Sequence, residues 1–436
     1  MDVVTLGESM VTFLPSRPGR LADVPSFERG IGGAESNVAC GLAAAGHSVK
    51  WVSRVGADGF GQHLLEAIAA HGVDTSAVQV DPARPTGIYF RTAGERALTP
   101  GPRRAEEPFG TGEDPFGTGE DPFGAGAAGG SPVGENPLAE VVYYRAGSAA
   151  SAMSPANMPG DELRSGRVLH LSGITAVLSA DCLALLRGLT APRPGRPLVS
   201  FDVNYRMGLR PDPAGVGGTL LDLARGSDLV FVGADEAEAA WGVTGGPAAI
   251  RAALPEPRLL VVKDGGRGAT VFERAPDEPG RGSDTGPDTG PGSDLGPDTG
   301  PDTGPDTDTG PGPGTGPGTG PGPDTVTHVP APRVDVVAHV GAGDGFAAGF
   351  LSATLRGLPV RDRLRHGHLM AAAALTVPGD LAMPPTREHA DRLAALDDDA
   401  WGTLRLGPGW TQAVDQVVDR AVDRVVDRAD EEVRTP

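Results

Sequence analysis

The sequence predicts an α/β fold in which helices flank a central, mostly parallel β-sheet. Five short and nearly continuous apolar runs are typical of buried parallel strands; they cover residues 49–52, 168–171, 198–201, 229–232 and 259–262. Apolar residues also recur at helical spacing just before Gly46 and Gly72, and a glycine commonly follows the end of a helix. Strands and helices alternate over residues 1–400, apart from two interruptions, and this alternation predicts one layered domain.

Two low-complexity segments interrupt this domain. Residues 97–138 contain a tandem repeat rich in Gly and Pro that is too short to bury its own phenylalanines, and we expect a flexible loop there. Residues 276–325 form a Pro-Asp-Thr-Gly array in which 27 of 50 residues are Gly or Pro. Because almost no apolar side chain is present to offset the chain entropy, we expect the array to be disordered. Within the charged segment 410–436, residues 413–429 repeat every four residues, which predicts a solvated helical tail, with partner binding as the alternative.

Charge and cysteine usage exclude several classes of protein. The net charge of −20 leaves no clustered Lys and Arg for a nucleic-acid backbone, so we expect no nucleic-acid partner. The N-terminus lacks a basic region and a long apolar core, and the longest uncharged apolar run, 369–377, is too short to cross a bilayer. These features predict a soluble, cytoplasmic protein without a membrane partner, and they leave a homo-oligomer open. Cys40 and Cys182 lie in apolar, helix-like stretches without metal-ligand spacing, which predicts reduced core residues.

The most informative motif covers residues 341–350, where small residues lead directly into an apolar helix with Asp344 in its first turn. At such a turn the N–H groups of Gly341, Ala342 and Gly343 and the positive helix end converge, which suits a transferring phosphoryl group. The Asp344 carboxylate can then accept the proton of an attacking hydroxyl. Taken alone, the motif is equally compatible with a turn that merely packs tightly. Neither a Walker ending, Gly-Lys-Ser/Thr, nor a Gly-x-Gly-x-x-Gly after the first strand is present, which disfavours P-loop and nicotinamide functions.

Two segments far apart in the chain carry a family resemblance. Residues 32–37 (Gly-Gly-Ala-Glu-Ser-Asn) together with residues 340–344 (Val-Gly-Ala-Gly-Asp) resemble the two signatures of the PfkB, or ribokinase-like, carbohydrate kinases. Within that family, four more blocks are similar to the 2-keto-3-deoxygluconate kinases: residues 86–89, 142–149, 170–175 and 202–206. The resemblance spans nearly the whole chain outside the low-complexity segments and the tail.

The resemblance implies a ribokinase-like sheet with a small β lid over the substrate. The lid strands are expected from about residues 10–31, 86–96 and 139–146. On the substrate side, Gly33 permits close approach of a ligand to the backbone, and Asn37 can hydrogen-bond sugar hydroxyls in two directions.

Four larger side chains complete the expected substrate site. Arg145 and Arg206 are candidates to grip the carboxylate of a sugar acid bidentately. Tyr89 and Tyr143 offer flat faces with hydroxyl groups, and by resemblance they lie on the lid with Arg145. The alternative for each arginine is a surface ion pair, and for each tyrosine a half-buried strand position.

The nucleotide side is also predicted by resemblance. Residues 262–269 resemble the segment that lies along the ATP phosphates, which makes Lys263, Gly265 and Gly268 candidate cofactor-binding residues; alone, the segment predicts a tight hairpin. His368 stands where a relative carries an asparagine beside the adenine. Residues 233–236 resemble the family's Asn-x-x-Glu motif, in which Glu236 takes the role of organising Mg²⁺ through water.

Three positions depart from the family pattern. Gly233 replaces the asparagine of the Asn-x-x-Glu motif, which removes one polar contact to the metal shell. Ala338 replaces an aspartate that in many relatives helps to hold a monovalent cation, so activation by potassium is doubtful. Asp264 stands where many relatives have a basic or neutral residue, and its charge would repel ATP phosphates unless the side chain points away.

These observations lead to one hypothesis and two alternatives. We expect an ATP- and Mg²⁺-dependent sugar-acid kinase that converts 2-keto-3-deoxygluconate to 2-keto-3-deoxy-6-phosphogluconate, with Asp344 as the base. The first alternative is a fructokinase or ribokinase, which would leave the two arginines without a carboxylate. The second is a weakly catalytic sugar-acid sensor that keeps the pocket despite the three departures.

Overall fold

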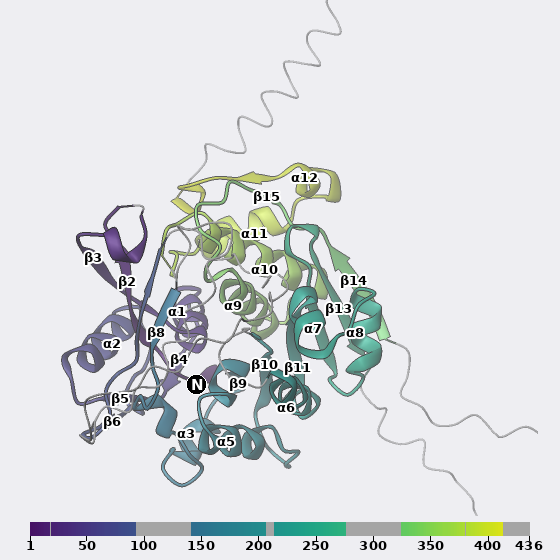
Figure 1. Cartoon of the computed structure of the whole chain (residues 1–436). Helices are drawn as coiled ribbons and strands as arrows, with labels where there is room; N and C mark the ends of the chain where they lie inside the picture. Colours follow the sequence, from purple (N-terminus) through teal and green to yellow (C-terminus); the bar gives the residue numbers. More distant parts are fainter. Residues whose placement is uncertain (18, 93–140, 206–212, 276–323, 380, 413–436) are drawn as a thin grey trace, which may run out of the picture.

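The computed structural model describes residues 1–17, 19–92, 141–205, 213–275, 324–379 and 381–412. An eight-stranded sheet forms its centre, in the order β14-β13-β12-β11-β10-β9-β1-β4 (Figure 1). Six strands are parallel: β1 (Val3–Leu6), β4 (Val49–Val52), β9 (Val168–Ser172), β10 (Leu198–Asp202), β11 (Leu229–Gly233) and β12 (Leu259–Lys263). The two others, β13 (Ala269–Arg274) and β14 (Asp324–Val329), are antiparallel. The predicted α/β fold and all five predicted parallel strands are confirmed.

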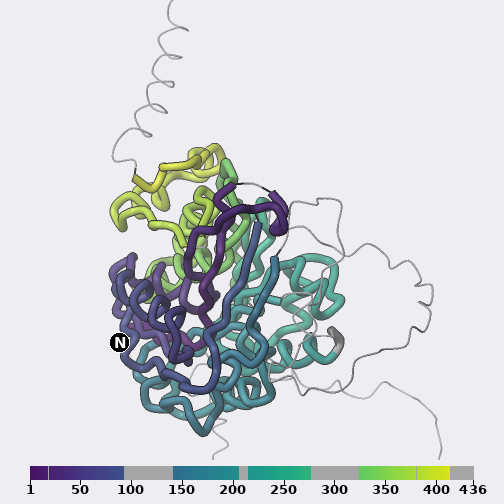
Figure 2. Tube along the Cα trace, turned by 60° about the vertical axis from the view of Figure 1, so that its left-hand side comes forward, coloured from purple at the N-terminus to yellow at the C-terminus, as the bar shows by residue number. Residues whose placement is uncertain are grey.

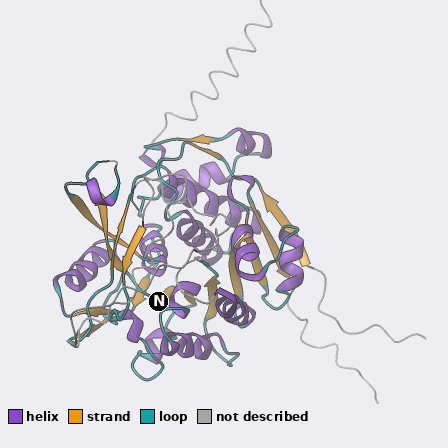
Figure 3. Cartoon of the chain, in the orientation of Figure 1, coloured by secondary structure: helices purple, strands orange, loops and turns teal. Residues whose placement is uncertain are grey.

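Helices cover both faces of the sheet (Figure 3). The core on one face contains residues of α1 (Ala34–Ala44), α2 (Gly59–Ala70), α9 (Ala342–Leu355), α10 (Val360–Leu375), α11 (Arg387–Ala394) and α12 (Asp398–Thr403). The core on the other face contains residues of α3 (Gly160–Leu163), α4 (Gly173–Ala176), α5 (Ala180–Thr190), α6 (Pro213–Arg225), α7 (Ala234–Trp241) and α8 (Pro247–Ala253). Strand residues alternate between the two cores, because successive side chains point to opposite faces: Leu229 and Phe231 lie in the first core, and Val230 and Val232 in the second.

Local sequence explains where the first two of these helices end. Gly46 and Gly72 have φ of 87° and 85°, a left-handed conformation that glycine adopts without strain, so both predicted helix ends are confirmed. Cys40 and Cys182 are buried free thiols, and burial raises the pKa of Cys40 to about 12. Within the described ranges, no helix has the length and apolar character that a bilayer crossing needs.

A second, smaller sheet stands beside the first. Its strands are β3 (Phe27–Gly32), β2 (Met10–Pro15), β7 (Ile88–Arg91) and β8 (Val141–Tyr144), in that order. Figure 2 shows these strands side by side along one flank of the molecule. Phe13 stacks on Phe90 with ring centroids 4.8 Å apart, which fixes β2 against β7. We call these four strands the small sheet.

Short elements complete the described fold. Two further strand pairs are β5 (Arg54–Gly56) with β6 (Gln79–Asp81), and β15 (Arg333–Val334) with β16 (Arg405–Leu406). The 3-10 helices are Leu21–Asp23, Ala150–Ala152, Gly265–Arg267 and Trp410–Gln412.

Two predicted boundaries need correction. Asp324 and Thr325, expected within the disordered array, begin β14, and Asp324 accepts two hydrogen bonds of 2.7 Å from Arg251. Residues 410–412, expected in the charged tail, form a 3-10 helix in which Trp410 is buried in the core. The predictions for residues 97–138, for the rest of the array and for the rest of the tail fall outside the described residues.

Candidate active site

The turn before α9 has the backbone geometry of an anion-binding site. Gly341 has a left-handed φ of 74°, and the helix begins at the next residue, Ala342. The first N–H to bond back into the turn is that of Gly345, which donates to the Gly341 carbonyl at 2.8 Å. The preceding N–H groups therefore have no partner within the helix, and they lie at its positive end. Residues 341–345 are all half-buried, so the turn is accessible to a ligand.

Asp344 meets Asn37 at this turn, although 307 positions separate them. Asn37 Nδ2 donates to Asp344 Oδ2 at 2.9 Å. The contact requires α1 and α9 to lie close together, and small residues allow it: a Cβ on Gly41 would lie 3.0 Å from the Cβ of Ala348. Asn37 Oδ1 is buried without a hydrogen-bond partner among the described residues, so it remains available to a sugar hydroxyl.

Gly33 lies directly against another part of the chain, and the approach of a ligand to its backbone stays a prediction. A Cβ at this position would lie 2.5 Å from the Glu8 carbonyl oxygen and 2.8 Å from Ser9 Cα. The group that approaches the Gly33 backbone is therefore the chain's own β1–β2 connection. This contact sets the start of α1 against the small sheet.

Arg145 is already engaged by a carboxylate of the protein. It forms an ion pair with Glu8, and the two side chains are 12% and 1% exposed. Ser148 Oγ donates to the other Glu8 oxygen at 2.6 Å. The pair is almost enclosed and so is not the surface ion pair considered as the alternative. Arg145 Nε is buried without a hydrogen-bond partner among the described residues, which leaves this N–H group for a ligand.

Tyr89 and Tyr143 pair across the small sheet. They are register partners on β7 and β8, with ring centroids 5.3 Å apart, and the Arg145 guanidinium lies 5.7 Å from the Tyr143 ring centroid. Tyr89 is buried, whereas Tyr143 is exposed. Arg206 lies outside the described residues, so only one of the two predicted arginines can be placed.

Lys263 ends β12 and lies among carboxylates. Its Nζ donates to both oxygens of Asp202 at 3.1 Å. Burial lowers the pKa of Lys263, but the charges of Asp202, Glu236 and Asp344 outweigh burial and hold the pKa above its usual value. The lysine is therefore cationic at neutral pH. Glu236 Oε2 also accepts the Gly233 N–H at 2.7 Å, which fixes the first turn of α7.

Gly265 and Gly268, the next two nucleotide-side candidates, lie in the β12–β13 hairpin but differ in exposure. Gly265 is exposed with φ of 53°, and nothing lies within 4 Å of where its Cβ would be. Gly268 is buried, and a Cβ there would collide with the Val329 carbonyl, so this glycine serves strand packing. Asp264 accepts hydrogen bonds of 2.7 and 2.6 Å from Arg267, which compensates the charge that departs from the family pattern.

His368 packs inside the core instead of opening toward a ligand. Its ring is 6% exposed, Nε2 lies 3.1 Å from the Val329 carbonyl oxygen, and the ring contacts Phe346 at 5.2 Å between centroids. Burial lowers the pKa of His368 to about 4, so the imidazole is neutral. This packing gives His368 a structural role and argues against the expected contact with a nucleotide.

Three buried acids near the carboxyl edge of the sheet had no predicted role. Glu8 and Asp202 hold Arg145 and Lys263, respectively, as described above. Glu35 Oε1 accepts hydrogen bonds of 2.7 Å from Ser172 and Thr175, and burial raises the pKa of Glu35. Glu35 lies in the block 32–37 and Asp202 in the block 202–206, and this position within the family motifs was the sequence signal that could have identified them.

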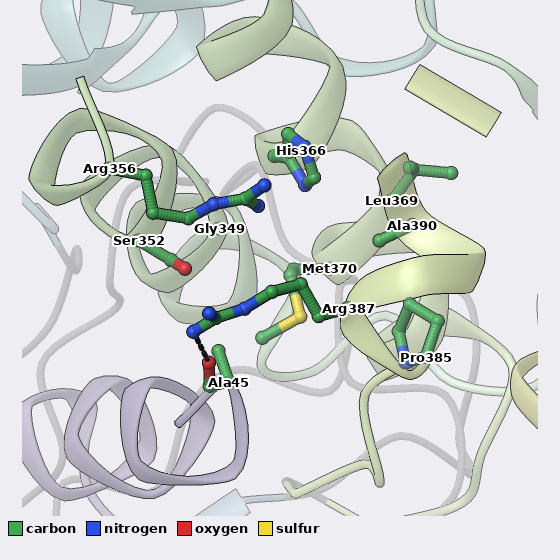
Figure 4. A pocket seen from close by; sticks show the side chains of 10 residues that line it. All are labelled: Ala45, Gly349, Ser352, Arg356, His366, Leu369, Met370, Pro385, Arg387 and Ala390. Atoms are coloured by element: carbon green, nitrogen blue, oxygen red, sulfur yellow. Dashed lines mark hydrogen bonds between the residues drawn. The ribbon is translucent and has the colours of Figure 1, made fainter. Parts of the chain in front are cut away.

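A separate cavity lies away from this site, between α9, α10, α11 and the end of α1 (Figure 4). Arg356 and Arg387 line it, but Arg356 is paired with Asp391 at 2.7 Å and Arg387 donates to the Ala45 carbonyl at 2.7 Å. The enclosed space is about 30 Å³, room for about one water molecule. It is too small for a sugar or a nucleotide.

The parallel sheet, the helix start suited to an anion and the carboxylate beside it are the features that an enzyme transferring a phosphoryl group needs. Residues 1–111, 135–283 and 322–387 match the pfkB family carbohydrate kinase pattern. The chain belongs to this family and is a carbohydrate kinase. The ribokinase-like fold and the kinase class predicted from the sequence are thereby confirmed.

Individual relatives agree with this assignment. A 2-dehydro-3-deoxygluconokinase of Bacillus subtilis is 30% identical over 391 residues, which cover 89% of this chain and 94% of the relative. One from Thermoproteus tenax is 29% identical over 274 residues, which cover 62% of this chain and 72% of the relative. The crystal structure of a PfkB protein from Polaromonas sp. superposes with a TM-score of 0.61 at 29% identity, covering 90% of this chain and 99% of the other.

Proposed function

We propose that this kinase uses ATP and Mg²⁺ to phosphorylate the primary hydroxyl of 2-keto-3-deoxygluconate, which is the same compound as 2-dehydro-3-deoxygluconate. The product is 2-keto-3-deoxy-6-phosphogluconate. The hydrogen bond between Asn37 Nδ2 and Asp344 Oδ2 carries the proposal, because it joins a sugar-binding candidate to the base at the anion-binding turn. The names of the relatives from B. subtilis and T. tenax support the choice of substrate.

The chemistry follows from the placement of Asp344. Asn37 orients the Asp344 carboxylate by donating to one of its oxygens, and this carboxylate accepts the proton of the attacking hydroxyl. The hydroxyl oxygen attacks the γ-phosphorus in line, the bond from that phosphorus to the β-phosphate oxygen breaks, and ADP leaves. The N–H groups at the start of α9 stabilise the charge on the transferring group.

The residues present fit a magnesium nucleotide. Among the described residues no group of three His, Cys, Asp or Glu could hold a metal ion alone. Mg²⁺ at such sites is typically held by one or two carboxylates, water and substrate phosphates, and Glu236 supplies a carboxylate near Lys263. When bound, Mg²⁺ neutralises phosphate charge. Of the nucleotide-side candidates, exposed Gly265 and Lys263, which lies beside the turn before α9, are best placed to contact the nucleotide.

A neutral sugar is the second candidate substrate, because Glu8 already compensates the charge of Arg145. A probable fructokinase of Arabidopsis thaliana is 25% identical over 402 residues. The sugar-acid proposal requires that Arg145, through its Nε–H, and Arg206 both contact the substrate carboxylate. A comparison of kcat/KM for 2-keto-3-deoxygluconate, fructose and ribose decides between the two, and higher values for the neutral sugars reject the sugar-acid proposal.

Asp344→Asn tests the catalytic assignment. We predict a fall in kcat of roughly 10²–10⁴-fold, because the amide cannot accept the hydroxyl proton. Sugar-acid binding, measured by calorimetry, should change little, since the side-chain shape is kept. Asp161→Asn is the matched control, because Asp161 is fully exposed and pairs only locally with Arg164. A kcat for Asp344→Asn near that of the control would remove Asp344 from the mechanism.

A further inference from the structure

A buried ion pair crosses the carboxyl ends of three neighbouring strands. Lys263 ends β12, Asp202 ends β10, and their side chains are 17% and 4% exposed. Strand β11 runs between them and ends at Gly233, the register partner of Lys263. The Lys263 side chain therefore reaches across the end of β11 to the aspartate.

The Lys263 ammonium lies against the anion-binding turn. A Cβ on Gly343 would lie 3.6 Å from Lys263 Nζ, which is ordinary van der Waals distance. Both hydrogen bonds of Nζ go to one carboxylate, and no other described residue accepts a hydrogen bond from it. An ammonium has three N–H donors, so at least one remains for a ligand at the turn.

We propose that Asp202 is a positioning residue that holds the Lys263 ammonium beside the Gly341–Gly343 turn, where Lys263 binds the β-phosphate of the nucleotide and the phosphoryl group that passes from it to the sugar. This inference rests on the proposed kinase reaction. A lysine side chain is flexible and loses rotamer freedom when it is fixed. Asp202 fixes it before the nucleotide arrives, so the positive charge is already placed where negative charge gathers in the transition state.

The competing explanation is that the pair only stabilises the fold. The chain offers a matched case in Lys50, which is 11% exposed and pairs with Glu162 at 2.5 Å and Asp74 at 3.2 Å. Lys50 lies on β4, at the opposite edge of the central sheet from β14, and β11, β10, β9 and β1 separate it from β12, which carries Lys263. Lys50→Met therefore reports the effect of losing a buried lysine outside the site.

The test is a double-mutant cycle on the full chain with Lys263→Met, Asp202→Asn and the double variant. Affinity for ADP and for adenosine is measured by calorimetry, and kcat with the sugar acid. We expect Lys263→Met to weaken ADP binding by about ten- to a hundredfold and to leave adenosine binding unchanged. Asp202→Asn should lower kcat at least about tenfold. In the Lys263→Met background, Asp202→Asn should change kcat and ADP affinity by less than about twofold.

Other outcomes overturn the proposal. Independent, multiplying effects of the two substitutions would show that Asp202 acts on its own, and equal losses for ADP and adenosine would show a structural role. The Lys50→Met control should change melting temperature without changing ADP affinity. If Asp202→Asn alone does not fold, the double variant, which leaves no unpaired buried charge, is compared with Lys263→Met.

The ADP measurements need no sugar, so they separate this inference from the choice of substrate. A wild-type protein that binds ADP but does not phosphorylate the sugar acid contradicts the proposed substrate and leaves the cycle informative. A wild-type protein that binds no ADP overturns both.

Discussion

At the scale of single residues, Glu8 and Arg145 decide what the site can recognise. Glu8 is enclosed by Arg145 on one side and Ser148 on the other, and a buried carboxylate stripped of its partner is costly. We therefore expect the pair to persist when a ligand binds. A substrate carboxylate then contacts Arg145 through Nε–H, which Glu8 does not use. Arg145 was predicted from the sequence, but Glu8 was not. The two residues are far apart in the chain, and local sequence does not reveal that they face each other.

We predict that Arg145→Met lowers kcat/KM for 2-keto-3-deoxygluconate by about ten- to a hundredfold, because a charge-assisted hydrogen bond is lost. The value for fructose should change by less than about threefold. The single variant also leaves Glu8 unpaired, so its free energy of unfolding should fall by about 3–5 kcal/mol. The double variant Arg145→Met/Glu8→Gln should regain stability without regaining activity on the acid. Equal losses on both substrates would mean that Arg145 shapes the small sheet instead of recognising a carboxylate.

At the scale of elements, the sequence predicted best the strands that are buried on both faces. Strands β9 to β12 are continuous apolar runs because each is covered by helices on both sides. The first two residues of strand β14, Asp324 and Thr325, were assigned to the disordered array because they match its composition. The place of β14 is fixed by pairing with β13 and by Arg251, which are tertiary contacts. The same packing of α10 against β14 turns His368 inward, which sequence position alone could not show.

This packing gives the fold a predictable response to acid. Burial lowers the pKa of His368 and of His170 to about 4, from 6.5 in the unfolded chain. Between pH 6.5 and 4 the unfolded chain therefore binds protons that the folded chain does not, so the free energy of unfolding falls as pH falls. Each histidine contributes at most about 3 kcal/mol across this window.

His368→Gln isolates one of these contributions, because glutamine can still donate to the Val329 carbonyl. We predict that stability falls less steeply between pH 6.5 and 4.5 in this variant than in the wild type, as measured by urea unfolding. Burial raises the pKa of Glu35, which acts in the opposite direction, but Glu35 is common to both proteins and cancels in the comparison. Parallel curves for the two proteins would contradict a neutral, buried His368.

At the scale of the whole molecule, the two low-complexity segments join strands that are already neighbours. Residues 276–323 connect β13 to β14 at the edge of the central sheet, where Arg274 and Asp324 are register partners. Residues 93–140 connect β7 to β8 at the edge of the small sheet, where Arg91 and Val141 are register partners. Composition identified both segments, but only the pairing of distant strands shows that each closes a hairpin. A hairpin connection at a sheet edge can change length without moving the core.

Deletion of residues 280–322 tests this arrangement. Six residues, 275–279 and 323, remain to join Arg274 to Asp324, which suffices for a hairpin loop because closure entropy depends only weakly on length. We predict a melting temperature within a few degrees of the wild type and a kcat/KM within about twofold. The control adds Asp324→Ala to the deletion. This substitution leaves the charge of Arg251, whose side chain is 8% exposed, without its ion-pair partner and should lower the free energy of unfolding by about 3–5 kcal/mol. A deletion alone that loses as much stability as this control, or that weakens sugar binding severalfold, would show that the removed residues belong to the fold or to the site.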